Sequence, residues 1–309
     1  MRQFAPLSAI VFAAGALPAL AQQSTAAPAP ASLVREGVTE KLTAHVWAIP
    51  DGSASLVPNV GIVVGSAGVL VIDTGMGTRN AETVLREVAK LGAGKPVYLV
   101  TTHVHPEHDM GAHAFPKGSK LIRSRDQVAD IAAGAGTSLV PLFSSRSSLI
   151  KELLADARHR AADILFDRDY SLDLGGLTAR IRAMGANHTF GDTVVLVDGV
   201  LFTGDIAMKP QPMFTNPKAT ITHWLASLDT LEALQPQRIV PSHGPFGGVE
   251  LIQGYRAYLT RIRARTAELK KAGKSLDESV QIVSGEMLAQ YPDQVRLTSA
   301  VRAGYNEAS

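Results

Sequence analysis

The stretch THVHPEHDMG, from Thr102 to Gly111, places three histidines and one glutamate within a few residues of one another. Imidazole and carboxylate groups are among the ligands that zinc, manganese and iron take from proteins. The preceding run, Val97 to Thr101, is short and apolar, which predicts a buried strand. Open α/β sheets place their chemistry just beyond the carboxyl ends of strands. We therefore interpret the histidine cluster as a metal site at a strand end.

Three later turns carry the same kinds of residue. Each contains a glycine, which lets the backbone bend sharply beside a site. The turns are GANHTFGD with His188, FTGD with Asp205, and PSHG with His243. A metal bound by these residues would lower the pKa of a water and polarise a carbonyl or phosphoryl oxygen. The seven candidate ligands are enough for two metal ions: His103, His105, Glu107, His108, His188, Asp205 and His243.

Strand signals precede helix signals in both halves of the chain. β-branched runs at 60–64 and 69–72 predict a hairpin. A helix is expected from about Ala81 to Leu91, with Thr78 and Asn80 as caps. In the second half, strands are expected on both sides of an Asp198-Gly199 hairpin turn. The pattern predicts an α/β fold. Further helices are expected at 147–160, 223–234 and 255–274.

Five motifs in order resemble the metallo-β-lactamase-fold superfamily. The resemblance runs from about Val46 to Gly247. It implies a four-layer αββα sandwich with the metal ions at one edge. The motifs are IDTG (72–75), TTHVHPEHDMG (101–111), NHTFGD (187–192), FTGD (202–205) and PSHG (241–244).

The resemblance also implies a role for each candidate residue. One metal would bind His103, His105 and His188, and the other would bind Glu107, His108 and His243. Asp205 would bridge the two metals. The candidate catalytic residues are Glu107, which would orient the nucleophile or accept its proton, and Asp73, which would steady the site. Two zinc ions per chain are expected, with iron or manganese as alternatives.

Glu107 departs from the family pattern, which has aspartate at this position. Glutamate keeps the negative charge but adds one methylene group. It could ligate a metal directly and preserve a two-metal site. Alternatively, the protein holds a single metal and Glu107 acts as a base.

The family contains several activities, and Asp205 helps to choose among them. Zinc β-lactamases of the superfamily generally have cysteine or serine there, so a dedicated β-lactamase is disfavoured. The tyrosine that follows this aspartate in quorum-signal lactonases is absent, since Ile206 follows Asp205. The layout is most similar to the exported SoxH-like and quinoprotein-relay group.

The expected activity is hydrolysis of an ester, thioester, lactone or related acyl bond of a small molecule by attack of a metal-bound hydroxide. Two other activities stay open: β-lactam hydrolysis, and a mononuclear iron oxygenase that acts on sulfur compounds. A metal-binding or accessory protein without enzymatic activity is a fourth reading.

The first residues predict export. Arg2, an apolar segment and an Ala-Leu-Ala cleavage site before Gln22 indicate a signal peptide at 1–21. A flexible tether is expected at 22–32, and one hydrolase domain with C-terminal helices at 33–309. The 309-residue chain has no cysteine, which suits a periplasmic or secreted protein. The segment is short for a stable membrane span. A net charge of +2 gives no case for nucleic acid binding, and the oligomeric state stays open.

Two loops are candidate walls of the active-site cleft. One is the proline-rich run 209–218, in which Met213 and Phe214 are expected to form an apolar lip. The other is 134–148. The basic helix expected at 255–274 is interpreted as a solvated surface helix whose apolar side packs inward, and His113 and His159 as structural or surface residues.

Overall fold

The computed structural model describes Met1 and residues 31–309. The predicted signal peptide and most of the predicted tether therefore lie outside the described residues. Among the described residues, no helix combines the length and apolar character needed to cross a membrane.

The first half of the chain forms a seven-stranded sheet whose strands follow one another in sequence order. Pairing is antiparallel from β1 to β4 and parallel from β4 to β7. The predicted hairpin is confirmed as β3 and β4. The strands are β1 (Glu40–Lys41), β2 (Val46–Ile49), β3 (Val60–Val64), β4 (Val69–Ile72), β5 (Val97–Val100), β6 (Lys120–Ser124) and β7 (Ile164–Phe166).

The second half forms a five-stranded sheet in the order β12-β11-β10-β9-β8. Its strands pair antiparallel except for β11 and β12, which are parallel. Asp198 and Gly199 both have positive φ and form the turn between β10 and β11, as the sequence predicts. The strands are β8 (Asp169–Asp173), β9 (Thr178–Gly185), β10 (Asp192–Val197), β11 (Val200–Gly204) and β12 (Arg238–Pro241).

The two sheets pack face to face through one apolar core. Leu70 and Val100 of the first sheet lie in the same buried cluster as Ile181, Val195 and Phe202 of the second. Burial of this surface is the main favourable term in the stability of the sandwich. Because β11 and β12 run parallel, the turns after them leave the sheet at the same edge.

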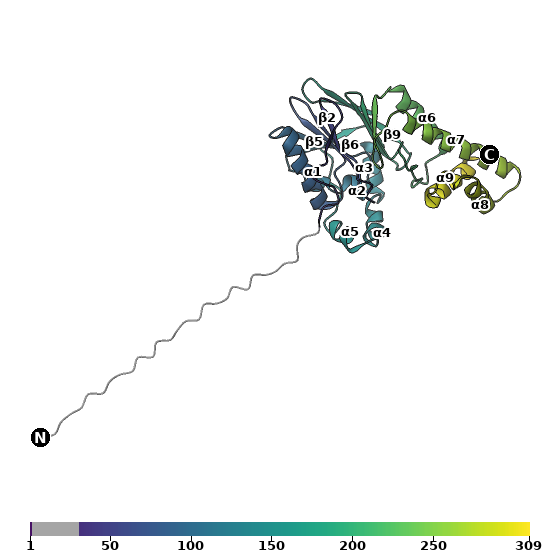
Figure 1. Ribbon diagram of the computed structural model, residues 1–309, viewed down its shortest axis with the longest axis horizontal. Helices are drawn as coiled ribbons and strands as arrows, with labels where there is room; N and C mark the ends of the chain where they lie inside the picture. Colours follow the sequence, from purple (N-terminus) through teal and green to yellow (C-terminus); the bar gives the residue numbers. More distant parts are fainter. Residues whose placement is uncertain (2–30) are drawn as a thin grey trace.

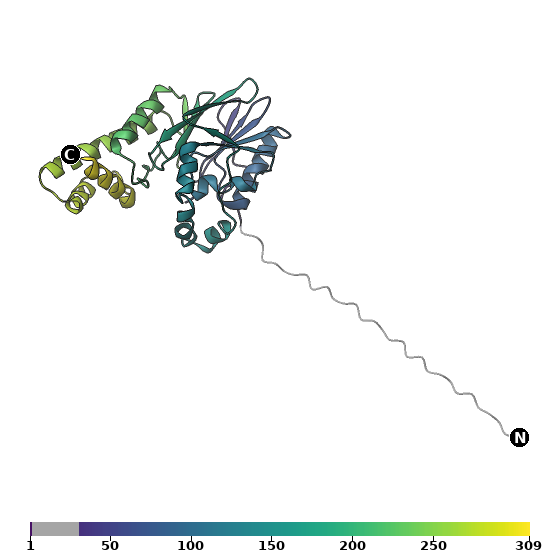
Figure 2. The ribbon, with the colours of Figure 1, turned by 180° about the vertical axis from the view of Figure 1, so that it is seen from behind.

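Helices cover the outer faces of both sheets (Figure 1). On the first sheet, α1 (Gly77–Gly92) buries Ala81, Val84 and Val88, spaced as on one helical face. On the second, α6 (Ile221–Ala233) and α7 (Glu250–Lys271) pack through Trp224 and Leu259. Figure 2 shows the same layers from behind, with α8 (Leu276–Met287) and α9 (Gln294–Glu307) beside α7. The fold is thus the predicted αββα sandwich.

Two helix predictions need correction. Helix α1 begins at Gly77, so Thr78 and Asn80 lie inside it rather than capping it. Asn80 instead accepts hydrogen bonds from the backbone N–H groups of Leu33 and Val34. The helix expected at 147–160 is only α5 (Ser148–Leu153), because the residues after it are fixed by bonds to other segments.

The basic helix is a packed surface helix, as expected. Its apolar side chains, among them Tyr258 and Ile262, are buried against the second sheet and the last helices. Arg256 pairs with Asp229 and Glu232, and Arg265 pairs with Glu286. These pairs offset the charge of two of the basic side chains on this helix.

Candidate metal centre

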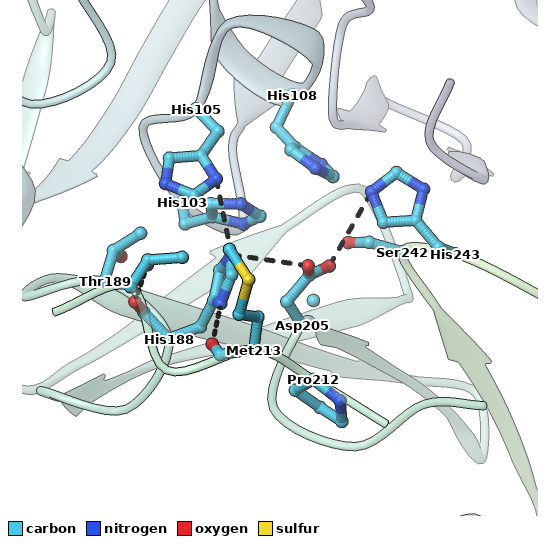
Figure 3. A network of polar contacts seen from close by, with 12 residues as sticks. His103, His105, His108, His188, Thr189, Asp205, Pro212, Met213, Ser242 and His243 are labelled. Atoms are coloured by element: carbon cyan, nitrogen blue, oxygen red, sulfur yellow. Dashed lines mark hydrogen bonds and ion pairs between the residues drawn. The ribbon is translucent and has the colours of Figure 1, made fainter. Parts of the chain in front are cut away.

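The seven predicted ligands converge at the edge of the sandwich where the strands end. His103 and His105 follow β5, and the short helix α2 (Pro106–Asp109) carries Glu107 and His108. His188 lies between β9 and β10. Asp205 follows β11 and His243 follows β12, so all four turns bring their side chains to one place (Figure 3).

The ligands form three groups that share members. Within each group, the donor atoms lie within 4.8 Å of one another. The groups are His103 with His105 and His188, His103 with His108 and Asp205, and Glu107 with His108 and His243. Asp205 lies between the outer two groups. Its carboxylate oxygens are 3.4 Å from His188 Nε2 and 3.9 Å from His243 Nε2.

Several donor atoms are buried without a hydrogen-bond partner among the described residues. They are His103 Nε2, Glu107 Oε2, His108 Nε2 and Asp205 Oδ1. Buried polar atoms are rarely left unpaired, because each costs its desolvation energy. Cations bound at the groups that contain these atoms would satisfy all four. The donor set of five histidines and two carboxylates therefore fits one or two metal ions of the zinc, iron or manganese type.

In three of the histidines, the second ring nitrogen has a hydrogen-bond partner that fixes the imidazole. His108 Nδ1 lies 2.8 Å from Asp73 Oδ2, His188 Nδ1 lies 2.7 Å from the Met213 carbonyl, and His243 Nδ1 lies 2.9 Å from the Val57 carbonyl. Such partners orient metal-binding histidines and fix their tautomer. The 209–218 loop thus positions a candidate ligand.

Asp73 occupies a fixed position behind the cluster. Its carboxylate accepts hydrogen bonds from the Thr102 backbone N–H at 2.7 Å and the Thr102 hydroxyl at 3.0 Å. Its backbone has a positive φ of 64°, which is uncommon outside glycine. The IDTG motif therefore aims this carboxylate at His108, one of the candidate ligands.

The pKa values suit cation binding. Burial, with neighbouring imidazoles, holds the pKa of His103 and His105 well below the usual range, so both are neutral. Burial opposes ionisation of Asp205, but His243 and His188 lower its pKa to about 2. Burial also lowers the pKa of His108, but Asp73 outweighs it and raises the value to about 9. A metal at His108 would therefore release a proton on binding.

Asp73→Asn is expected to weaken metal binding about 10- to 100-fold at the His108 group, because it removes the charged acceptor that orients this ring. The measurement is a competition titration with a chromogenic chelator. Ser242→Ala is the control, since its hydroxyl makes only a 3.3 Å contact with Asp73. Equal affinities of Asp73→Asn and wild type would contradict the assigned role.

The turn that carries His243 is held by residues from the first half of the chain. Asn59 donates to the carbonyls of Pro241 and Gly244, at 2.8 and 2.9 Å. Asp51 accepts from the Gly244 N–H at 2.8 Å. The sequence reasoning missed both residues, because neither lies near a motif and their partners are almost 200 residues away.

A buried ion-pair network lies next to the segment that carries His103 to His108. The sequence reasoning also missed this network. Asp109, next to His108, pairs with Arg123 and with His159. Burial by itself raises the pKa of Asp109, but Arg123 and His159 outweigh it and keep the value lowered. His159 also contacts the Ala135 carbonyl at 3.1 Å. The network connects the segment that carries His103 to His108 with the 134–136 segment. His159 is therefore structural, as expected.

A cavity of about 610 Å³ lies beside the cluster, with His105 in its lining. Segments 134–139 and 215–218 line it, so both loops predicted as walls contribute to it. The predicted apolar lip is wrong for Phe214, whose ring packs 4.6 Å from Trp224 in the core of the second sheet.

The sandwich with a histidine-rich cluster at its edge defines a class of metal-dependent hydrolase-like proteins. The chain belongs to the metallo-beta-lactamase superfamily, whose family model matches residues 55–243.

A curated relative is similar at low sequence identity. The chain is 25% identical over 258 residues to a linear primary-alkylsulfatase of Pseudomonas sp. (strain ATCC 19151), covering 70% of this chain and 48% of that protein. It thus spans about half the length of that curated relative.

Solved structures show the same fold. A beta-lactamase domain protein from Burkholderia ambifaria has a TM-score of 0.62 at 22% identity, covering 88% of each chain. The inverting sec-alkylsulfatase from Pseudomonas sp. has a TM-score of 0.65 at 16% identity, covering 86% of this chain and 49% of that one.

Proposed function

We propose that the protein is an exported hydrolase with two zinc ions that cleaves an ester, thioester, lactone or related acyl bond. The observation that carries this proposal is the convergence of seven donors, six of them buried, four of which have an atom left unpaired. Bound zinc would supply an activated water and an electrophilic contact for the substrate oxygen.

Residues of the chain supply the charge and the space that this reaction needs. Asp205 is ionised and central, so it contributes negative charge between the two outer histidine groups. Burial raises the pKa of Glu107, so a nearby cation would favour its ionised form. The cavity beside His105 offers room for the part of the substrate that does not react.

A second candidate is hydrolysis of a sulfate ester. The curated relative is named as an alkylsulfatase, and this supports testing the activity in the present chain. The same donor set would serve, because sulfate and carboxylic esters both need an activated water and a stabilised oxyanion.

A substrate panel tests the proposal. Zinc-loaded protein is assayed with chromogenic esters, a thioester, a lactone, a chromogenic cephalosporin and dodecyl sulfate. The proposal expects the highest kcat/KM for an acyl substrate, with His103→Ala as the background. A cephalosporin rate that exceeds the acyl-substrate rates by orders of magnitude would replace the proposal with β-lactam hydrolysis. Release of sulfate without hydrolysis of any acyl substrate would replace it with sulfate-ester hydrolysis. Oxygen uptake with a thiol substrate and a single iron would indicate an oxygenase instead.

Export is part of the proposal, since the apolar segment and Ala-Leu-Ala site at 19–21 are typical of a signal peptide. The full chain and a variant that lacks residues 2–21 are compared by cell fractionation. Export predicts that only the full chain reaches the periplasm or medium. Equal retention of both in the cytoplasm would contradict it.

A further inference from the structure

The cavity beside the metal centre has a composition that restricts its occupant. We infer that the substrate joins an apolar segment to an anionic oxyacid group, a carboxylate, sulfate or phosphate, and that Lys218 binds this anion away from the reacting bond. This inference rests on the proposed function, because it assigns the substrate class of the same site.

The walls of the cavity are mainly small or apolar. They include Ala129, Ala133, Leu139, Phe190 and Pro217. The apolar part of this surface binds hydrocarbon by the release of water, while Ser138, Thr189 and Thr215 are among the polar residues of the lining. It therefore fits an alkyl or aryl segment that extends from the scissile bond beside His105.

Lys218 supplies the positive charge of this cavity. Its ammonium lies over the Phe190 ring, 5.1 Å from the ring centroid, and it forms no ion pair within residues 31–309. Asn216 accepts a hydrogen bond from the Lys218 backbone N–H at 2.9 Å, which shapes the loop around it. The lysine is thus placed at an apolar wall with its charge available to a ligand.

The acidic side chain in the cavity lining does not cancel this charge. Asp130 accepts a hydrogen bond from the Phe190 backbone N–H at 3.1 Å, and no ion pair joins it to Lys218 within residues 31–309. The remaining titratable group in the lining is His105, which belongs to the metal cluster.

Lys218 is exposed, and a hydrogen bond from its ammonium to an anion is stronger than one between neutral groups. Lysine binds an oxyanion as a point charge and therefore accepts a carboxylate, sulfate or phosphate without fixed geometry. Neutral substrates would fill the apolar part of the cavity but leave Lys218 solvated. The inferred preference is therefore for anionic amphiphiles.

The test is a binding measurement with octane-1-sulfonate, which cannot be hydrolysed. Calorimetric titration compares zinc-loaded wild type with Lys218→Met, which keeps an unbranched side chain but removes the charge. We expect at least about tenfold weaker binding for Lys218→Met, as for the loss of one charged hydrogen bond. Lys218→Arg should bind within about twofold of wild type, since the charge is retained.

Lys117→Met is the matched control, because this lysine is exposed and lies outside the cavity. It should bind as wild type does. Equal binding by wild type and Lys218→Met, or no binding by wild type, would overturn the inference even if the esters are hydrolysed. Binding that depends on Lys218 with no hydrolysis in the substrate panel would overturn the proposed function and leave the anion site standing.

Discussion

Asp205→Asn is expected to lower kcat/KM for the best panel substrate by at least about 10³-fold, since each 1.4 kcal/mol in the barrier is tenfold and metal chemistry contributes several. The carboxylate lies between His188 and His243, and these histidines hold its pKa at about 2. An amide has similar shape but no charge, so it cannot offset two divalent ions. Metal content should fall together with activity.

Steady-state kinetics and metal analysis on the same sample check this result. Asp277→Asn makes the same chemical change at an exposed residue of α8 and should leave both values unchanged. Circular dichroism shows whether the variant is folded. A folded Asp205→Asn protein with less than a tenfold loss would contradict the central position assigned to this carboxylate.

Glu107→Gln separates the two roles that its position allows. If Glu107 ligates a metal, the variant loses one of two ions and about 10²- to 10³-fold in kcat/KM, because a neutral amide is a weak ligand. If Glu107 is only a base, the ion content is unchanged and kcat falls about 10²- to 10⁴-fold. The structure favours ligation, since Glu107 Oε2 is buried, unpaired and grouped with His108 and His243.

Glu107→Asp is the matched control, because it restores the residue typical of the family and keeps the charge. It should retain two ions per chain and most of the activity if the backbone of α2 adapts to the shorter side chain. Retention of both ions by Glu107→Gln would show that this carboxylate is not a metal ligand.

Local sequence patterns predicted most of the strands, and the resemblance to the superfamily implied the sandwich. β-branched runs marked β3 and β4, Asp198-Gly199 marked the hairpin, and glycine-rich turns marked the ends of β9, β11 and β12. The candidate ligands could be predicted because each lies in a short motif after a strand. Parallel strands then bring these ends together, which explains why the ligands meet.

The residues that support the site could not be predicted in the same way. Asp51 and Asn59, from the first half of the chain, form hydrogen bonds with the turn that carries His243. Arg123 and His159 form ion pairs with the buried carboxylate of Asp109. Each contact joins segments that are distant in sequence and depends on how the layers pack. The hydrophobicity of Phe214 fits both the wall of a cleft and the core, so the sequence alone does not place it. In the fold, its ring packs against Trp224 in the core.

The most direct test of the two-metal centre is the metal content of the protein, measured by plasma mass spectrometry after purification without a chelator. The account predicts about two zinc ions per chain, as expected for closely spaced metal pairs in hydrolases. Reconstitution of metal-free protein with zinc should give the same ratio. One ion per chain under both conditions would contradict the account and leave Glu107 without a metal to bind.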